Sequence, residues 1–360
     1  MLVSWLVLGL VLALAACSGS GDGAGQTSTT ASPSNVPAVV TPPEARRPRS
    51  GGGLAGSFTT NLHSALSSGV PVAQGSFADP FFLVTPTAIY AYATNVSDAH
   101  IPVARSDTAS TSVDLGDAMP TLASWTKPGG VWGPSVYVRD DGTYVMYYAT
   151  TYGETGHQCV SHAVASNPAG PFVDESTAPF VCPLDLGGAI DPSMATIDGQ
   201  HWLLYKSDGN CCGLPTSIWS LPLSDDLLSV QGTATELVTN DQPWEGDVVE
   251  APDMEDIGGT LFLFYSGNDW NTDRYAVGYA VCESVTGPCR KPQSTPLVQS
   301  GGDVAGPGGE TFVVDPRSDR VVMGFHGWLP GQVGGADGRR RLYLGEVTAH
   351  DGTLRFDPYR

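Results

Sequence analysis

Val249-Glu250-Ala251-Pro252-Asp253-Met254, followed by Gly259-Thr260-Leu261-Phe262-Leu263-Phe264-Tyr265-Ser266, is the stretch from which the fold can be predicted. It places a carboxylate and a proline at the start of one apolar run, and a short glycine turn leads into a second apolar run. Apolar runs of this length bounded by Gly and Pro are typical of β-strands. The stretch therefore predicts two consecutive strands with a carboxylate at the mouth of the first.

The same pattern occurs at four other places in the chain. The prolines that anchor the five copies are Pro80, Pro134, Pro192, Pro252 and Pro307. Successive prolines are 54, 58, 60 and 55 residues apart, and a period of this size with short strands and Gly/Asp turns is typical of propeller blades. The sequence predicts an all-β fold, a five-bladed β-propeller in which each innermost strand starts at its proline.

Residues next to these prolines should converge on the central axis, and three of the five copies carry a carboxylate there: Asp79, Asp191 and Glu250. Glycoside hydrolysis needs one carboxylic acid to protonate the leaving oxygen and one carboxylate to activate water or attack the anomeric carbon. Neighbouring carboxylates push each other's proton affinities apart, so that one can stay ionised while another stays protonated. A single Asp-Pro is usually only a turn dipeptide, but the repetition predicts a funnel-shaped active site.

Residues 75–357 resemble glycoside hydrolase family 43, whose members are five-bladed propellers that act on arabinose- and xylose-containing polysaccharides. The resemblance rests on Phe77-Ala78-Asp79-Pro80, Ile190-Asp191-Pro192-Ser193 and Val249-Glu250-Ala251-Pro252, together with Trp132-Gly133-Pro134 and Met323-Gly324-Phe325-His326. It implies an inverting mechanism with Asp79 as general base and Glu250 as general acid. It also implies that Asp191 orients the acid and modulates its pKa.

The resemblance further implies that His326 lies on the axis and helps to hold a calcium or sodium ion through water, while no other cofactor is required. Without the resemblance, a histidine after an apolar strand is a satisfied core residue. The companion motif of the family ends Gly-Pro-Gly-His, whereas this chain has Gly306-Pro307-Gly308-Gly309. This departure leaves the outer part of the site open.

Aromatic residues near the blade mouths are candidates to stack on sugar rings, namely Phe81, Trp132 and Trp270. Packing within a β-rich fold is the alternative for each of them. Arg341 is a candidate to bond sugar hydroxyls, with an exposed charge at a blade edge as the alternative.

The N-terminal part of the chain predicts export. Residues 1–16 form an apolar segment that ends in Leu14-Ala15-Ala16-Cys17, which resembles the signal peptide and lipidation box of bacterial lipoproteins. A plain secretory signal is the alternative. Residues 17–55, rich in Gly, Ser, Thr and Pro, predict a flexible tether, and residues 56–360 form the propeller domain. We expect an exported protein that is anchored to the membrane through lipid on Cys17, or an extracellular one.

Six cysteines remain after Cys17, and an even number in an exported domain favours disulfides. Their proximity along the chain suggests the pairs Cys159–Cys182 and Cys282–Cys289. Cys211 and Cys212 are then left to form a vicinal disulfide, unless the pairing differs. No His/Cys spacing resembles a zinc site.

The charge of the chain excludes nucleic acid as a partner. Its net charge is −20, although only 15% of its residues are charged. We expect a monomer whose partner is a polysaccharide or oligosaccharide, and whose activity releases arabinofuranosyl or, second, xylosyl units. The alternatives are a β-xylosidase or an endo-arabinanase of the same family, or a non-catalytic carbohydrate-binding propeller. A retaining fructosidase is disfavoured because Ile190 and Ala251 stand where its arginine and cysteine would be.

Overall fold

The computed structural model describes residues 76–108, 111–314, 320–335, 338–350 and 352–358. The segments predicted as signal peptide and tether, and Cys17 with them, lie outside the described residues. All described strands belong to one compact unit, Gly52–Arg360. None of the helices among the described residues is long and apolar enough to span a bilayer.

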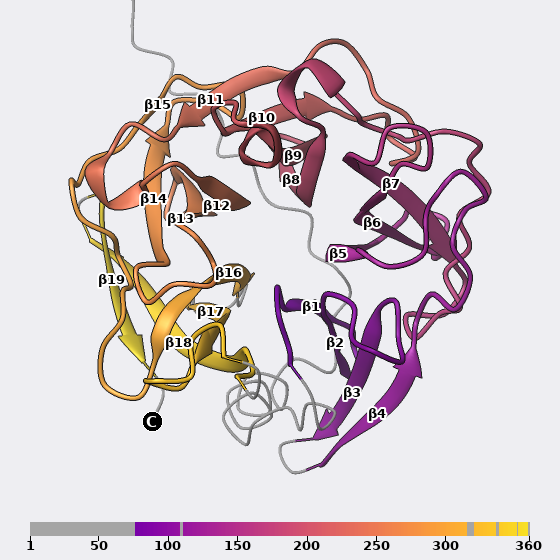
Figure 1. Ribbon diagram of the computed structural model, residues 1–360, viewed down its shortest axis with the longest axis horizontal. Helices are drawn as coiled ribbons and strands as arrows, with labels where there is room; N and C mark the ends of the chain where they lie inside the picture. The colour runs from indigo at the N-terminus through magenta and orange to yellow at the C-terminus, as the bar shows by residue number, and fades with distance from the viewer. Residues whose placement is uncertain (1–75, 109–110, 315–319, 336–337, 351, 359–360) are drawn as a thin grey trace, which may run out of the picture. The chain divides into compact units, whose positions relative to one another are not determined.

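The described strands form five sheets around a central axis, which confirms the predicted five-bladed β-propeller (Figure 1). Neighbouring strands within each sheet are antiparallel. The sheets are, in chain order, β1 (Phe81–Val84), β2 (Ile89–Tyr92), β3 (Pro102–Thr108) and β4 (Thr111–Asp117); β5 (Trp132–Val138), β6 (Tyr144–Thr151) and β7 (Gln158–Ala165); β8 (Ala189–Ile197), β9 (Gln200–Ser207), β10 (Ser217–Pro222) and β11 (Thr235–Thr239); β12 (Val249–Ile257), β13 (Thr260–Gly267), β14 (Ala276–Cys282) and β15 (Cys289–Arg290); β16 (Ala305–Val314), β17 (Val321–Trp328), β18 (Arg341–His350) and β19 (Thr353–Pro358). The short 3-10 helices are η1 (Leu184–Leu186), η2 (Gly209–Cys212) and η3 (Pro243–Glu245).

The hydrophobic core is divided into five clusters, and each cluster joins two neighbouring blades. Between the first and second blades, for example, Leu83 and Tyr90 pack with Val136 and Tyr148. The ring is closed by packing of the fifth blade against the first and by a hydrogen bond of 2.7 Å from the Phe77 N–H to the Arg340 carbonyl. Because apolar side chains cover both faces of a blade, its strands read as continuous apolar runs; all of β17 is buried.

The repeated prolines lie at breaks in the innermost strands, not at their starts. Four of these strands begin two or three residues before the proline, and only β1 begins just after it. The pairing of the innermost strand with the next one breaks around Pro134, Pro192, Pro252 and Pro307. Proline lacks the N–H that the ladder needs, so a bulge accommodates it within a longer strand.

The residue before each proline adopts the same left-handed backbone conformation. The φ angles are 50° at Asp79, 52° at Gly133, 52° at Asp191, 51° at Ala251 and 56° at Gly306. For a residue other than glycine this conformation costs about 1–2 kcal/mol. The blade repeat is therefore also a repeat of backbone strain at the axis, where the packing of five blades maintains it.

Three disulfides are present among the described residues, and they join the pairs expected from the sequence. Cys282–Cys289 links β14 to β15 at the outside of the fourth blade. Cys159–Cys182 links β7 to the segment that runs beside it, where Val160 and Val181 form an isolated bridge. Cys211–Cys212 joins adjacent residues in η2.

Candidate active site

The three predicted carboxylates line one cavity of about 480 Å³ near the axis of the propeller. Asp79 precedes β1, Asp191 lies in β8, and Glu250 lies in β12. Asp79 and Asp191 both stand directly before a proline, whereas Glu250 stands one position earlier, next to the left-handed Ala251. The carboxylates therefore come from two positions of the blade repeat. The positions that correspond to Glu250 in the second and third blades are Trp132 and Ile190, which line the same cavity.

Asp79 is surrounded by groups that favour its ionised form. Its Oδ2 accepts a hydrogen bond from Thr94 Oγ1, and its Oδ1 lies 3.6 Å from Arg340 Nη1 and 3.3 Å from His326 Nδ1. Burial alone would raise the pKa of Asp79, but Arg340, His326 and Thr94 together hold it well below the ordinary value. Asp79 is therefore an ionised carboxylate that can accept a proton.

Glu250 is held at both oxygens. Lys206 Nζ donates a hydrogen bond of 3.0 Å to Oε2, and Tyr275 Oη donates one of 2.8 Å to Oε1. Burial opposes the charge on Lys206, but Glu250 and Asp208 outweigh it and raise its pKa, so Lys206 is a buried cation. Tyr275 stays neutral because burial, with Glu250 and Asp79 nearby, raises its pKa well above the ordinary value. These two donors fix the orientation of the Glu250 carboxyl group.

Asp191 is a candidate to hold a proton at neutral pH. Burial, followed by the charges of Glu250 and Asp79, raises its pKa to about 8, against the opposing effects of Lys206 and of the Ala251 N–H, which donates to Oδ2 at 2.9 Å. The charge of Glu250 contributes to this rise, so the two carboxyl groups interact electrostatically. The site thus combines an ionised Asp79 with an Asp191 that favours its protonated form.

We expect Asp191→Asn to stabilise the protein more at pH 9 than at pH 4. The folded pKa of Asp191 is raised to about 8 from 3.8. Between these values the folded state binds a proton that the unfolded state has lost, so wild-type stability falls as the pH rises, and the penalty is complete above about pH 8. Asparagine does not titrate and lacks this penalty.

Thermal unfolding of wild type and variant at both pH values provides the measurement. The melting temperature of the variant relative to wild type should increase by about 2 °C or more from pH 4 to pH 9. A difference that does not change with pH would contradict the raised pKa of Asp191.

Two of the four residues predicted to bind sugar line the catalytic cavity, namely Trp132 and Trp270. Phe81 lies elsewhere: it borders a smaller axial cavity and packs edge-on against Tyr137, with ring centroids 5.3 Å apart. Phe81 is the first residue of β1, directly after Pro80.

Arg341 also does not reach the catalytic cavity. Its side chain is exposed at the start of β18, whereas Arg340 lines the cavity and lies 4.5 Å from the ring centroid of Trp270. Adjacent residues of an extended segment point to opposite sides, so Arg340 faces the cavity and Arg341 does not.

Sequence reasoning did not single out the residues that hold the carboxylates in place, which are Thr94, Lys206, Asp208, Tyr275 and Arg340. Lys206 carried a usable signal, because it is a charged residue that ends the run Trp202-Leu203-Leu204-Tyr205 within a buried strand. A buried lysine needs a carboxylate partner. Tyr275 and Thr94 carried no comparable signal.

The small axial cavity of about 40 Å³ lies beneath the carboxylates and is lined by all five innermost strands. Ser135, Asp253, Glu310 and Thr311 supply oxygen atoms to its lining. Ser135 Oγ, Glu310 Oε1 and Thr311 Oγ1 are buried and have no hydrogen-bond partner among the described residues. Burial raises the pKa of Asp253 to about 7 and that of Glu310 well above its ordinary value. Oxygen donors of this kind suit calcium or sodium.

His326 is fully buried and accepts a hydrogen bond of 3.1 Å from the Asp79 N–H at Nδ1. Burial and the charge of Arg340 lower its pKa, against the opposing effect of Asp79, and its Nε2 has no partner among the described residues. This chain has Gly309 where the family motif has histidine. A side chain at this position would clash with the site, because its Cβ would lie 2.5 Å from His326 Nδ1 and 2.7 Å from Asp79 Oδ1.

A second cavity, of about 1000 Å³, adjoins Glu250 over the third and fourth blades. Asn210, Glu250 and Trp270 line this cavity as well as the catalytic one. Asp79 and Asp191 line the catalytic cavity but not this second one. Glu250 therefore stands between a pocket that holds the other carboxylates and a wider space.

A family profile described as glycosyl hydrolases family 43 matches residues 68–354. The chain is 25% identical over 241 residues to a probable arabinan endo-1,5-alpha-L-arabinosidase C of Aspergillus niger, which covers 59% of this chain and 70% of the relative. It is 28% identical over 209 residues to the extracellular endo-alpha-(1->5)-L-arabinanase 2 of Bacillus subtilis, covering 54% of this chain and 42% of that protein.

Solved structures share the fold. A thermostable family-43 glycoside hydrolase superposes with a TM-score of 0.70 at 24% identity, over 80% of this chain and 95% of that one. An alpha-L-arabinofuranosidase from Lactobacillus brevis superposes with a TM-score of 0.65 at 20% identity, over 78% of this chain and 94% of that one.

Proposed function

Because the chain belongs to glycosyl hydrolase family 43, we propose that it is an inverting glycoside hydrolase that releases arabinofuranosyl, or alternatively xylosyl, units from plant-type polysaccharides or their oligosaccharides. The observation that carries the mechanism is the combination, in one cavity, of an ionised Asp79, an Asp191 that favours its protonated form and a Glu250 held at both oxygens. An ionised carboxylate and a protonated carboxyl group are thereby present at the same pH.

In the proposed reaction, Asp79 accepts a proton from a water molecule whose oxygen forms the new bond to the anomeric carbon. Glu250 donates its proton to the glycosidic oxygen as the bond from that oxygen to the anomeric carbon breaks. Asp191 acts on Glu250 through the electrostatic interaction of the two carboxyl groups, and Lys206 and Tyr275 keep the acid in place. After product release, Asp79 gives its proton to solvent and Glu250 takes one up from solvent.

The second cavity supports a substrate that continues beyond the cleaved bond. The general acid faces the leaving group, and Glu250 also lines the cavity of about 1000 Å³. This space favours an oligosaccharide or polymer on the leaving-group side. The same observation, together with the arabinan-degrading relatives, favours endo-arabinanase activity as the second candidate function. A β-xylosidase stays an alternative.

We also propose that a calcium or sodium ion occupies the axial cavity, held by Asp253, Glu310 and the hydroxyls of Ser135 and Thr311, with His326 in contact through water. The buried oxygens without partners support this. When bound, the ion would supply positive charge beneath the carboxylates.

The remaining expectations are part of the same proposal. The protein is a monomer, and it is exported and either anchored to the membrane through lipid on Cys17 or extracellular; its N-terminal sequence supports the export. A tether of this composition would keep the propeller accessible to polysaccharide.

The decisive experiment is hydrolysis of aryl α-L-arabinofuranoside and aryl β-D-xyloside, with the first-formed anomer followed by proton NMR. We expect one of these substrates to yield the sugar with inverted configuration, which also identifies the sugar. A retained configuration would contradict the roles of Asp79 and Glu250. Lack of hydrolysis of both substrates, and of arabinan and arabinoxylan fragments, would favour a carbohydrate-binding propeller.

A further inference from the structure

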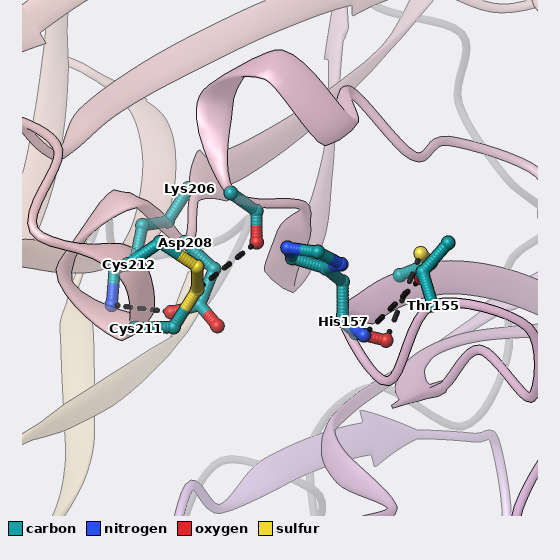
Figure 2. Close-up of a disulfide and its surroundings, with 8 residues drawn as sticks. Thr155, His157, Lys206, Asp208, Cys211 and Cys212 are labelled. Carbon is teal, nitrogen blue, oxygen red and sulfur yellow. Dashed lines mark hydrogen bonds and ion pairs between the residues drawn. A yellow bond between two sulfur atoms is a disulfide. The ribbon is translucent and has the colours of Figure 1, made fainter.

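Cys211 and Cys212 form a disulfide between adjacent residues in η2, within the connection from β9 to β10 (Figure 2). Both residues are exposed, in contrast to the buried Cys159 and Cys282 of the other bridges. A disulfide stabilises a fold mainly by constraining the unfolded chain, and this effect becomes smaller as the closed loop becomes shorter. A bridge between neighbours closes no loop of this kind, so global stability does not account for it.

The disulfide lies beside the cavity in which the substrate is proposed to bind. Cys211 lines the catalytic cavity together with Asp79, Asp191 and Glu250. Asn210 lines both this cavity and the larger one, and Gly213 and Leu214 continue into the larger one. The η2 connection is thus a wall common to the two spaces on either side of the general acid.

The η2 connection packs closely against the residues around Gly187. Cys211 Sγ lies 3.5 Å from the Gly187 carbonyl oxygen, and a Cβ at Gly187 would lie 2.6 Å from the Asp208 carbonyl oxygen. His157 reaches across from the second blade, and Figure 2 shows its ring opposite the disulfide. One nitrogen of His157 and the two sulfur atoms all lie within 4.8 Å of one another. This proximity resembles a metal site, but metals bind thiolates and not the sulfurs of a disulfide.

The disulfide adds to the apolar surface of the cavity. Most of its lining consists of charged or amide-bearing side chains, and its apolar members besides Cys211 are Trp132, Ile190 and Trp270. A pentose presents hydroxyl groups at its edge and C–H groups on its faces. Charged groups can bind the hydroxyls, but the C–H faces need apolar partners.

We propose that the Cys211–Cys212 disulfide is a substrate-contact surface, on which the C–H face of the pentose in the catalytic cavity packs. This inference rests on the proposed function, since it assumes a pentose beside Asp79, Asp191 and Glu250. The bridge fixes the two sulfur atoms relative to the backbone, so the contact surface is pre-organised before the sugar binds. It contributes to affinity and to the choice of sugar, not to proton transfer.

The test is the double variant C211A/C212A, assayed on the aryl glycoside that the wild type hydrolyses. We expect KM to rise about tenfold while kcat changes little, because an apolar contact to the sugar is lost and the acid and base are intact. The matched control is C282A/C289A, which removes a disulfide at the outside of the fourth blade and should leave both constants unchanged.

Other results would overturn the contact. An unchanged KM, or a loss confined to kcat, would show that the disulfide does not touch the sugar. A loss of kcat would instead indicate an effect on the general acid through Asp208 and Lys206, since Lys206 donates hydrogen bonds to both Asp208 and Glu250. If the alanine variant does not fold, the closer isostere C211S/C212S decides in the same way. Reduction of wild type by a dithiol should also raise KM, and should not affect C211A/C212A.

Failure of the proposed function is distinguishable from failure of this inference. If the wild type hydrolyses neither the aryl glycosides nor arabinan or arabinoxylan fragments, the function fails, and binding of L-arabinose and D-xylose is measured by NMR on wild type and C211A/C212A. Weaker pentose binding by the variant would then support the contact surface, and equal binding would overturn it. If the wild type hydrolyses a substrate and the variant does so with equal KM, only the contact surface is lost.

Discussion

Glu250→Gln is expected to lower kcat about 10³-fold on natural oligosaccharides, whose leaving groups need a proton. Glutamine keeps the length and hydrogen-bonding shape of the side chain, but it cannot donate the proton that the glycosidic oxygen requires. The contacts from Lys206 Nζ and Tyr275 Oη, at 3.0 and 2.8 Å, show that this side chain is already held in one orientation. Loss of rate should therefore reflect chemistry more than position.

The leaving group separates the two explanations. Dinitrophenolate leaves without being protonated, so Glu250→Gln should lose far less activity on a dinitrophenyl glycoside than on an oligosaccharide. Asp208→Asn is the matched control, because it changes the other carboxylate bound to Lys206, at 3.3 Å, and leaves the acid in place. Equal losses of Glu250→Gln on both substrates would show that Glu250 is not the general acid.

Asp79→Asn is expected to lower kcat by about 10²–10⁴-fold on every substrate, whatever the leaving group. The attacking water must lose a proton in each case, and an amide cannot accept it. Arg340, His326 and Thr94 hold the wild-type carboxylate ionised, so wild-type activity should persist to low pH. The dinitrophenyl substrate thus rescues the acid variant and not the base variant.

Thr94→Val provides the control for this second prediction. It removes the hydrogen bond to Asp79 Oδ2 while keeping the shape of the residue. Since that bond lowers the pKa of Asp79, its loss raises this pKa, and the acid limb of the pH profile should move to higher pH. A base variant whose loss depends on the leaving group would contradict the assignment of Asp79.

Much of the fold was predictable because each blade contains the same short sequence pattern. The recurrence of a carboxylate or glycine, a proline and an apolar run at intervals of 54–60 residues identified the blades before any contact was known. The same repeat identified Asp79 and Asp191, since both directly precede the repeated proline. Proximity along the chain was also enough to suggest Cys282–Cys289 and Cys159–Cys182.

The details of strand geometry were less predictable. The prolines were expected at strand starts; Pro80 does directly precede its strand, but the other four lie at bulges inside longer strands, because the antiparallel ladder resumes on both sides of them. Which of two adjacent side chains faces the cavity depends on the local strand geometry, so that Arg340 lines it and Arg341 does not, and Phe81 borders the axial cavity.

The sequence by itself determined the number of blades, the acidic residues at their mouths and the family to which the chain belongs, since these depend on patterns within each repeat. Only the tertiary structure decided the protonation of the site and its surroundings. The partners that set it are distant along the chain: His326 lies 247 residues from Asp79, and Lys206 lies 44 residues from Glu250. The closure of the ring brings them together, and burial in that shared core makes their charges interact strongly. The same closure places the disulfide of two adjacent cysteines beside the catalytic carboxylates.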